Sequence, residues 1–220
     1  MIVIMKIENS FAFNEAKPSR TYRGVALREL IIAEASDRFL ERGYSAVSVE
    51  EIIQSVGGSK TNVYRHFGGK KGLFIAVIRS LASEFLDKVR STEITGKTPT
   101  EGLRQVAHNL LAQLLDERHL AFQHLLIAEV QRFDELGKVW LESQDQQSGR
   151  VLAKFIYELQ QKKQLRECDP LLAATLFHNM ISYHPIHRAM AGLPLTAAEL
   201  DTFIDEAVVL FVQGYGVSSA

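Results

Sequence analysis

The chain has 220 residues, of which 46% are hydrophobic and 23% charged, a composition typical of a globular protein. Its 25 Lys and Arg residues nearly balance 26 Asp and Glu residues, so the whole chain is not a generally basic nucleic-acid binder. A single cysteine, Cys168, excludes an internal disulfide bond and favours a reducing compartment. Apolar runs are too short for a signal peptide or a membrane span, so we expect a cytoplasmic protein with no membrane partner.

Charge is unevenly distributed along the chain. Residues 20–90 carry 12 Lys and Arg against 8 Asp and Glu, whereas the rest of the chain is acidic. The run 52–83 contains five basic residues and no acidic residue. Positive charge without neighbouring carboxylates favours a polyanionic partner. A solvated basic surface is the alternative interpretation.

The first predicted elements are an arm and a helix. Residues 1–20 show no sustained periodicity, so we expect a flexible N-terminal arm. Apolar residues recur at helical spacing from Leu27 to Phe39, which predicts a helix over 23–42 that ends at Gly43.

Three more helices are predicted between residues 48 and 90. Ser48 and Glu51 have the spacing of a capping box, which predicts a short helix ending near residue 55. After the glycine pair 57–58, Ser59 is expected to cap a second short helix that ends at residue 67. A longer helix begins at Lys70 and continues to about residue 90.

The second half of the chain is also predicted to be helical. A polar linker at 91–97 precedes a helix that starts with the capping box Thr98 to Glu101, and a similar box, Thr196 to Glu199, starts the last helix. The intervening pattern predicts helices over 119–131, 136–164 and from 169 onward. Strand-like alternation and internal repeats are absent from the sequence, so the expected fold is all-α with about nine helices.

The pair of short helices in residues 48–67 matches a helix-turn-helix. If Val63 lies on the buried side of the second helix, the opposite face carries Thr61, Asn62, Tyr64 and Arg65. These side chains can hydrogen bond with base edges or phosphates in a major groove, and the free amides beside Ser59 and Lys70 favour an anion. A helical hairpin with a polar outer face is the alternative, and the acid-free run favours DNA.

Four stretches, 31–44, 48–53, 59–67 and 70–74, together resemble the DNA-binding domain of TetR/AcrR-family transcriptional regulators. The segment 132–140 is similar to one AcrR-like subgroup. The resemblance implies a helix-turn-helix DNA-binding domain with a connecting helix in 21–90. It also implies a helical effector-binding and dimerisation domain in 91–220.

The resemblance assigns roles to several residues of the DNA-binding face. Thr61 and Asn62 occupy the positions that usually touch bases, and Tyr64 and Lys70 those that usually touch phosphates. The full candidate set is Ser48, Ser59, Lys60, Thr61, Asn62, Tyr64, Arg65 and Lys70. One departure is Gly58, because the family usually has a small apolar residue there. Glu50 places an acid near the DNA side, where it either adds selectivity by repulsion or faces solvent.

The last two helices carry apolar stripes too wide for one neighbour to bury. The resemblance implies that they pair with their copies in a four-helix homodimer interface, and a core helix of a monomer is the alternative. The candidate interface residues are Leu172, Leu176, Phe203, Ala207, Leu210 and Phe211. A two-fold dimer would place two DNA-binding helices on a near-palindromic double-stranded operator.

Family members usually bind a small-molecule effector in the second domain, and this relieves DNA binding. The resemblance therefore implies a repressor released by a small, largely apolar effector. The candidate pocket residues are His108, Leu111, Phe122, Leu126, Phe133, Trp140, Phe155, Phe177, Met180 and His184. An ordinary hydrophobic core would have the same composition.

Other chemistries receive little support from the sequence. His178, His184 and His187 are close together, but no Cys or carboxylate stands at ligand spacing, so neither a metal nor a cofactor is expected. GxSxG, P-loop and dinucleotide-binding motifs are absent, which argues against an enzyme. A helical adaptor that binds protein through residues 48–75 is the third alternative.

Overall fold

The computed structural model describes residues 20–90, 93–145 and 148–217, and these residues form ten α-helices and no strand. The predicted arm, residues 1–20, lies almost wholly outside the described residues. The first four helices are α1 (Arg20–Ala46), α2 (Val49–Val56), α3 (Lys60–Phe67) and α4 (Lys70–Arg90). The others are α5 (Pro99–Leu114), α6 (Glu117–Glu129), α7 (Asp134–Asp145), α8 (Ser148–Gln161), α9 (Pro170–Met190) and α10 (Ala197–Tyr215).

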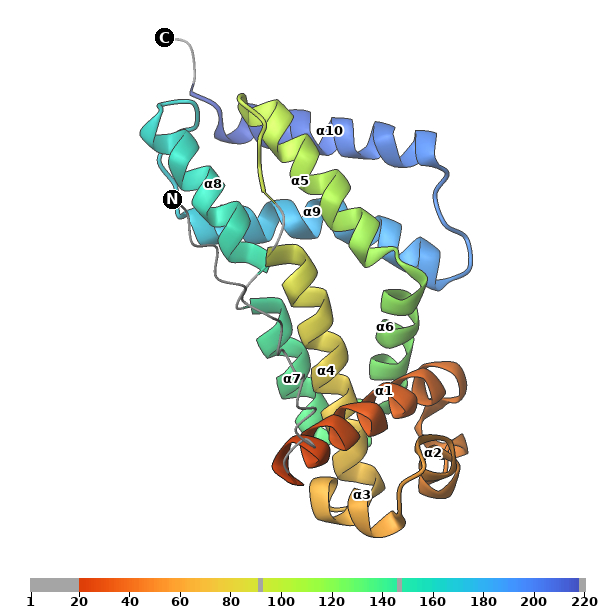
Figure 1. Cartoon of the computed structure of the whole chain (residues 1–220). Coiled ribbons are helices and arrows are strands. Elements are labelled where there is room, and N and C mark those ends of the chain that lie inside the picture. Colours follow the sequence, from red (N-terminus) through yellow and green to blue (C-terminus); the bar gives the residue numbers. More distant parts are fainter. Residues whose placement is uncertain (1–19, 91–92, 146–147, 218–220) are drawn as a thin grey trace, which may run out of the picture.

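The helices are arranged around the long helix α4 (Figure 1). The α1, α2 and α3 helices lie together at its N-terminal end, and α5, α8, α9 and α10 pack together beyond its C-terminal end. The α6 and α7 helices pack against α4 along its length. None of the helices in the described residues is long and apolar enough to span a membrane.

Side-chain caps start several helices as the sequence predicts. Both halves of a capping box are present at Ser48, Thr98 and Thr196. The regular part of the first helix ends at Gly43 as predicted, because Gly43 takes a positive φ of 74° and kinks α1, which continues to Ala46. These signals depend on a few neighbouring residues, which explains why the sequence alone predicts them.

The prediction of one helix over 136–164 is wrong. The structure has two separate helices there, α7 and α8, and the described residues therefore contain ten helices instead of about nine. The run 142–150 between their apolar portions contains no hydrophobic residue. A run of this composition has no apolar stripe, so its sequence does not favour a continuous packed helix.

The buried side chains form two hydrophobic clusters. The first combines α1 to α4 with α6 and α7, and an aromatic group consisting of Phe39, Tyr44, Phe74 and Phe133 lies at its centre. The second combines α5, α8, α9 and α10. Side chains from the second half of the chain, such as Phe122 and Leu136, thus complete the core around the helix-turn-helix.

Candidate nucleic-acid interface

The α2 helix begins at a complete capping box. The Ser48 hydroxyl accepts a hydrogen bond from the Glu51 amide at 3.2 Å, and the Ser48 amide donates to the Glu51 carboxylate at 3.1 Å. Arg42 from α1 donates to the same carboxylate at 2.7 Å. These contacts hold the pKa of Glu51 below its usual value, with the Ser48 amide as the main cause and Arg42 second. The start of α2 is therefore fixed to α1.

A short turn joins α2 to α3. Gly57 takes a left-handed conformation with φ of 70°, and Val63 of α3 is completely buried against the core. Ser59 stands at the N-cap position of α3, but its side chain makes no capping hydrogen bond. Ser59 is thus the N-cap residue as predicted, but its hydroxyl does not cap the helix, and the Asn62 amide donates to the Ser59 carbonyl at 2.9 Å instead.

The face of α3 opposite Val63 lies at the surface. Thr61, Tyr64 and Arg65 are exposed, and the Tyr64 residue is 63% exposed despite its large ring. Asn62 is partly exposed and accepts a hydrogen bond from Arg65 at 3.2 Å. The polar groups predicted to contact DNA therefore point away from the protein interior.

A groove of about 330 Å³ runs between the start of α2, α3 and the first residue of α4. It contains four residues of the predicted DNA-binding set: Ser48, Lys60, Tyr64 and Lys70. Glu50, expected near the DNA side, also lines this groove, and so does Ser45, which sequence analysis missed. Ser45 lies in none of the stretches that resemble the family, so only the packing of α1 against α2 places it at the groove.

Two of the basic residues have carboxylate partners. Lys60 forms an ion pair with Glu50, and Lys71 forms one with Glu135 of α7 at 2.9 Å. Hydrogen bonding within the first pair raises the pKa of Lys60 and lowers that of Glu50. The acid-free run in the sequence is thus partly neutralised by acids that other elements supply.

Lys70 is held by the end of α1. Its ammonium group lies 4.4 Å from the centre of the Tyr44 ring and donates to the Ser45 carbonyl at 3.4 Å. Burial, and secondly the charge of Arg132, lowers the pKa of Lys70. Arg132 lies 4.8 Å from the same ring and donates to the Ser45 hydroxyl at 2.9 Å. The segment between α6 and α7 therefore supports one wall of the groove.

The ten predicted pocket residues do not converge on one cavity. Phe122, Leu126 and Phe133 belong to the first hydrophobic cluster, whereas Leu111, Phe155 and Phe177 belong to the second. His108 is exposed with its ring 3.8 Å from Asp201, and His184 is exposed beside Phe203. Met180 packs against the second cluster, and the side chain of Trp140 lies outside the described part. A cavity of about 720 Å³ between α6 and α9 is lined by none of these ten residues.

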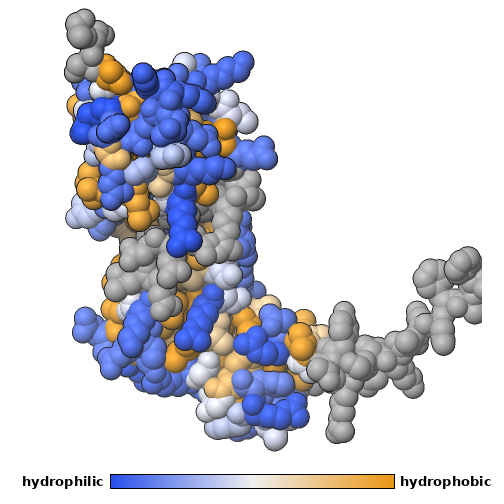
Figure 2. Space-filling view, turned by 90° about the vertical axis from the view of Figure 1, so that its left-hand side faces the viewer, coloured by the Kyte–Doolittle hydropathy of each residue, from blue (hydrophilic) through white to orange (hydrophobic). Residues whose placement is uncertain are grey.

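The predicted dimer residues divide into exposed and buried sets. Leu172, Leu176 and Leu210 are 56%, 49% and 59% exposed on α9 and α10. Phe203 is half-buried, while Ala207 and Phe211 are buried within the protomer. Apolar side chains also reach the surface in the upper half of the molecule in Figure 2, around the C-terminal helices.

The described residues contain no cluster of three potential metal ligands.

An all-α chain with an exposed helix-turn-helix face, carried on a larger helical body, defines a DNA-binding transcriptional regulator. A family model described as "Bacterial regulatory proteins, tetR family" matches residues 31–77, and one described as "AefR-like transcriptional repressor, C-terminal domain" matches residues 101–217. The second match covers more than half of the chain. This chain belongs to the TetR family of transcriptional regulators.

Curated relatives and solved structures agree with this assignment. The chain is 31% identical over 131 residues to the transcriptional repressor AcnR of Corynebacterium diphtheriae, covering 58% of this chain and 63% of the relative. It is 31% identical over 75 residues to the regulator QacR of Staphylococcus aureus, covering 34% of this chain and 40% of the relative. The matches therefore span less than two thirds of the length of these relatives.

Similarity to solved structures extends over most of the chain. A TetR-family regulator from Mesorhizobium loti is 31% identical with a TM-score of 0.77, covering 89% of this chain and 99% of that one. The Flavonoid-responsive Regulator FrrA is 25% identical with a TM-score of 0.74, covering 89% and 100%. All of these proteins are regulators, so the comparisons support a regulator and not an enzyme.

Proposed function

We propose that this protein is a ligand-responsive repressor that binds a near-palindromic operator as a homodimer and is released by a small, largely apolar effector. In this proposal residues 21–90 contact DNA, and residues 91–220 bind the effector and form the dimer. The observation that carries the proposal is the exposed face of α3 beside the groove that contains Ser48, Lys60, Tyr64 and Lys70.

The DNA-binding part of the proposal assigns two kinds of contact. Thr61 and Asn62 project from the first turn of α3, where a recognition helix contacts base edges. Tyr64, Lys70 and the free Ser59 hydroxyl are suited to phosphate oxygens. Lys60 forms an ion pair with Glu50 in the free protein. A DNA phosphate must therefore displace the Glu50 carboxylate before the Lys60 ammonium group can contribute to binding.

The homodimer is supported by the exposed leucines of α9 and α10. A monomer in water gains nothing from exposing Leu172, Leu176 and Leu210, whereas a second copy would bury them. A two-fold arrangement presents two α3 helices, and this explains the expectation of a near-palindromic operator.

Release by an effector is supported by one of the similar structures. The name of FrrA describes that protein as flavonoid-responsive, and its fold extends over nearly all of this chain. Repression is supported by the name of AcnR, which is a transcriptional repressor. An effector can release DNA only if it binds the free protein more tightly than the DNA-bound protein.

The proposal can be tested with the purified full-length protein and DNA fragments selected from the genome of its source. We expect the Kd to rise steeply with salt, because bound phosphates release counterions. Replacing Tyr64 by Ala should weaken binding to all selected sites by a similar factor, whereas Asn62→Ala should change which bases are preferred.

Arg28→Ala provides a matched control, because Arg28 is a cation on α1 that lies over the Phe67 ring outside the groove. It should leave the base preference unchanged. Binding that is insensitive to salt, or an Asn62→Ala variant with an unchanged base preference, would contradict the assignment of α3.

A further inference from the structure

The cavity of about 720 Å³ lies between α6 and α9 and includes the start of α8. Its rim is exposed: Ile127 is 58%, Leu171 48% and Tyr183 68% exposed. Its floor is buried, with Gln123 and Ser182 each 5% exposed. The cavity is thus a pocket with an open mouth and a polar floor, and its volume is within the range of small-molecule sites.

The polar groups of the floor have free hydrogen-bonding capacity. Ser182 is buried, yet its hydroxyl makes no hydrogen bond within the described part of the chain. Gln123 donates one amide hydrogen to the His119 ring at 2.9 Å, which leaves its carbonyl oxygen without a partner there. Among the described residues, only Gln113 has a side-chain oxygen that is both sealed from solvent and without a partner, so the Ser182 and Gln123 oxygens remain accessible at the cavity that both residues line. These atoms suit a ligand that supplies one donor and one acceptor.

The described lining residues carry no permanent charge. They include no Asp, Glu, Lys or Arg, and apolar walls are formed by Leu114, Ile127, Ile186 and Met190. Burial lowers the pKa of His178, so its ring is neutral near pH 7. An ionised ligand would lose its hydration at the floor without gaining an opposite charge there.

We propose that this cavity is the effector site, and that it selects an uncharged, mostly apolar molecule whose hydroxyl or amide group hydrogen bonds with Ser182 and Gln123. This inference rests on the proposed function and gives it a location and a ligand class. The site differs from the pocket expected from sequence, because none of the ten predicted residues lines it.

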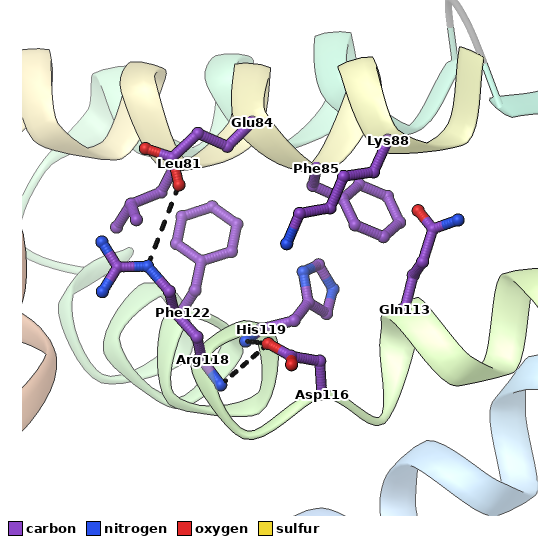
Figure 3. A pocket seen from close by; sticks show the side chains of 9 residues that line it. All are labelled: Leu81, Glu84, Phe85, Lys88, Gln113, Asp116, Arg118, His119 and Phe122. Atoms are coloured by element: carbon purple, nitrogen blue, oxygen red, sulfur yellow. Dashed lines mark hydrogen bonds and ion pairs between the residues drawn. The ribbon is translucent and has the colours of Figure 1, made fainter. Parts of the chain in front are cut away.

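The floor of the cavity is also connected to α4. His119 accepts from Gln123 on one side, and its ring stacks on Phe85 of α4 with the centroids 4.3 Å apart. Figure 3 shows His119 on α6 facing α4. His119 also lines a smaller pocket of about 30 Å³. A ligand that shifts the Gln123 side chain would therefore displace His119, and the His119 ring would pass the displacement to Phe85 of α4.

The test uses three fluorescent probes of the same shape: phenanthrol, which is uncharged, phenanthrene carboxylate and phenanthrylmethylammonium. Titration of the full-length protein should give a Kd for phenanthrol at least about tenfold below that of either ion, because the floor offers no counter-charge. Ser182→Ala should weaken phenanthrol binding about fivefold, as expected for one lost hydrogen bond, without lowering the Tm.

Ser36→Ala is the matched control, because Ser36 is a buried serine on α1 outside the cavity. It should leave probe affinity unchanged. If Ser182→Ala fails to fold, Gln123→Met tests the same contact and should show a similar loss. The inference is overturned if either ion binds as tightly as phenanthrol or more tightly. It is also overturned if phenanthrol does not bind, or if Ser182→Ala and Gln123→Met leave its Kd unchanged.

Operator binding is measured on the same preparation. Suppose that the protein binds DNA normally, but that it binds phenanthrol no more tightly than the two ions and that the variants do not change the Kd for phenanthrol. Only the assignment of the cavity as the effector site then fails. If DNA is not bound at all, the proposed function fails whatever the probes do.

Discussion

Two adjacent glycines in the turn before α3 have different backbone requirements. Gly57 takes a positive φ of 70°, which a side chain rarely adopts, whereas Gly58 does not. A Cβ atom added at Gly58 would lie 3.4 Å from the Ile53 side chain and 3.6 Å from that of Asn62, both ordinary contacts. The turn therefore requires glycine at the first position and tolerates alanine at the second.

Gly58→Ala should stabilise the protein by roughly 0.5–1 kcal/mol, because alanine restricts the unfolded chain without straining the turn. Thermal unfolding should show a Tm increase of about 1–4 °C. Gly57→Ala provides the comparison and should lower stability by about 1 kcal/mol. A Tm decrease in both variants would indicate that the turn cannot accept a side chain at either position.

At the scale of single residues, local features were predictable and long-range ones were not. The outward direction of Thr61, Tyr64 and Arg65 follows from helical geometry once Val63 is placed inside. The ion pair between Lys60 and Glu50 depends on how α2 and α3 pack, so it could not be predicted from residue spacing. The same holds for Lys71 and Glu135, which are far apart in the sequence.

Apolar periodicity in the sequence also could not predict which residues line the proposed effector site. It correctly indicates that Phe122 and Phe177 are buried, but not that they belong to two different clusters. The polar floor residues Gln123 and Ser182 stand out only when α6 and α9 are placed side by side. A sequence pattern for such a site would be a lone polar residue on an apolar face.

At the scale of elements, the contact between α4 and α6 depends on a buried histidine. His119 is 9% exposed and stacks on Phe85, and burial lowers its pKa to about 4. The opposing effect of Asp116 is smaller. The ring therefore stays neutral in the folded protein at pH values where it would be protonated in the unfolded chain.

The sign of the resulting pH effect follows from proton linkage. Between the ordinary pKa of 6.5 and the folded value of about 4, the unfolded chain binds the proton and the folded chain does not. The free energy of unfolding should therefore fall by roughly 1.5 kcal/mol from pH 6.5 to pH 5. His119→Gln should remove this part of the pH dependence in denaturant titrations at the two pH values. An identical pH dependence in both proteins would show that the ring is not held neutral.

The helices themselves were predicted well wherever a cap or a glycine marks an end. The starts at Thr98 and Thr196 agree with the structure because each needs only four consecutive residues. The separation of α7 from α8 was missed, since a polar run is compatible with an exposed helix as well as with an interruption. Only the packing of neighbouring helices distinguishes these possibilities.

At the scale of the whole molecule, the exposed leucines of α9 and α10 make the oligomeric state the main question. Leu176→Lys should convert the expected dimer to a monomer, because each copy would place a charge in the apolar contact. Sedimentation velocity should show half the mass of the unmodified protein. Operator affinity should fall by at least about tenfold, since one α3 helix alone must then bind.

Leu30→Lys is the matched control for mass, because Leu30 is 57% exposed on α1, away from α9 and α10 (Figure 1). It should sediment like the unmodified protein. If the unmodified protein is a monomer at micromolar concentration, the proposed two-fold arrangement on DNA is excluded.

The aromatic group around Tyr44 and Phe74 has a consequence for cutting the protein into pieces. Phe133 packs against both rings with centroid distances of 4.8 Å and 5.4 Å, although it belongs to the segment after α6. A fragment that stops after α4 would leave these rings facing water on the side that Phe133 and Leu136 cover. The helix-turn-helix is therefore not an autonomous module, and engineered chimaeras that graft it onto another body must also carry α6 and α7.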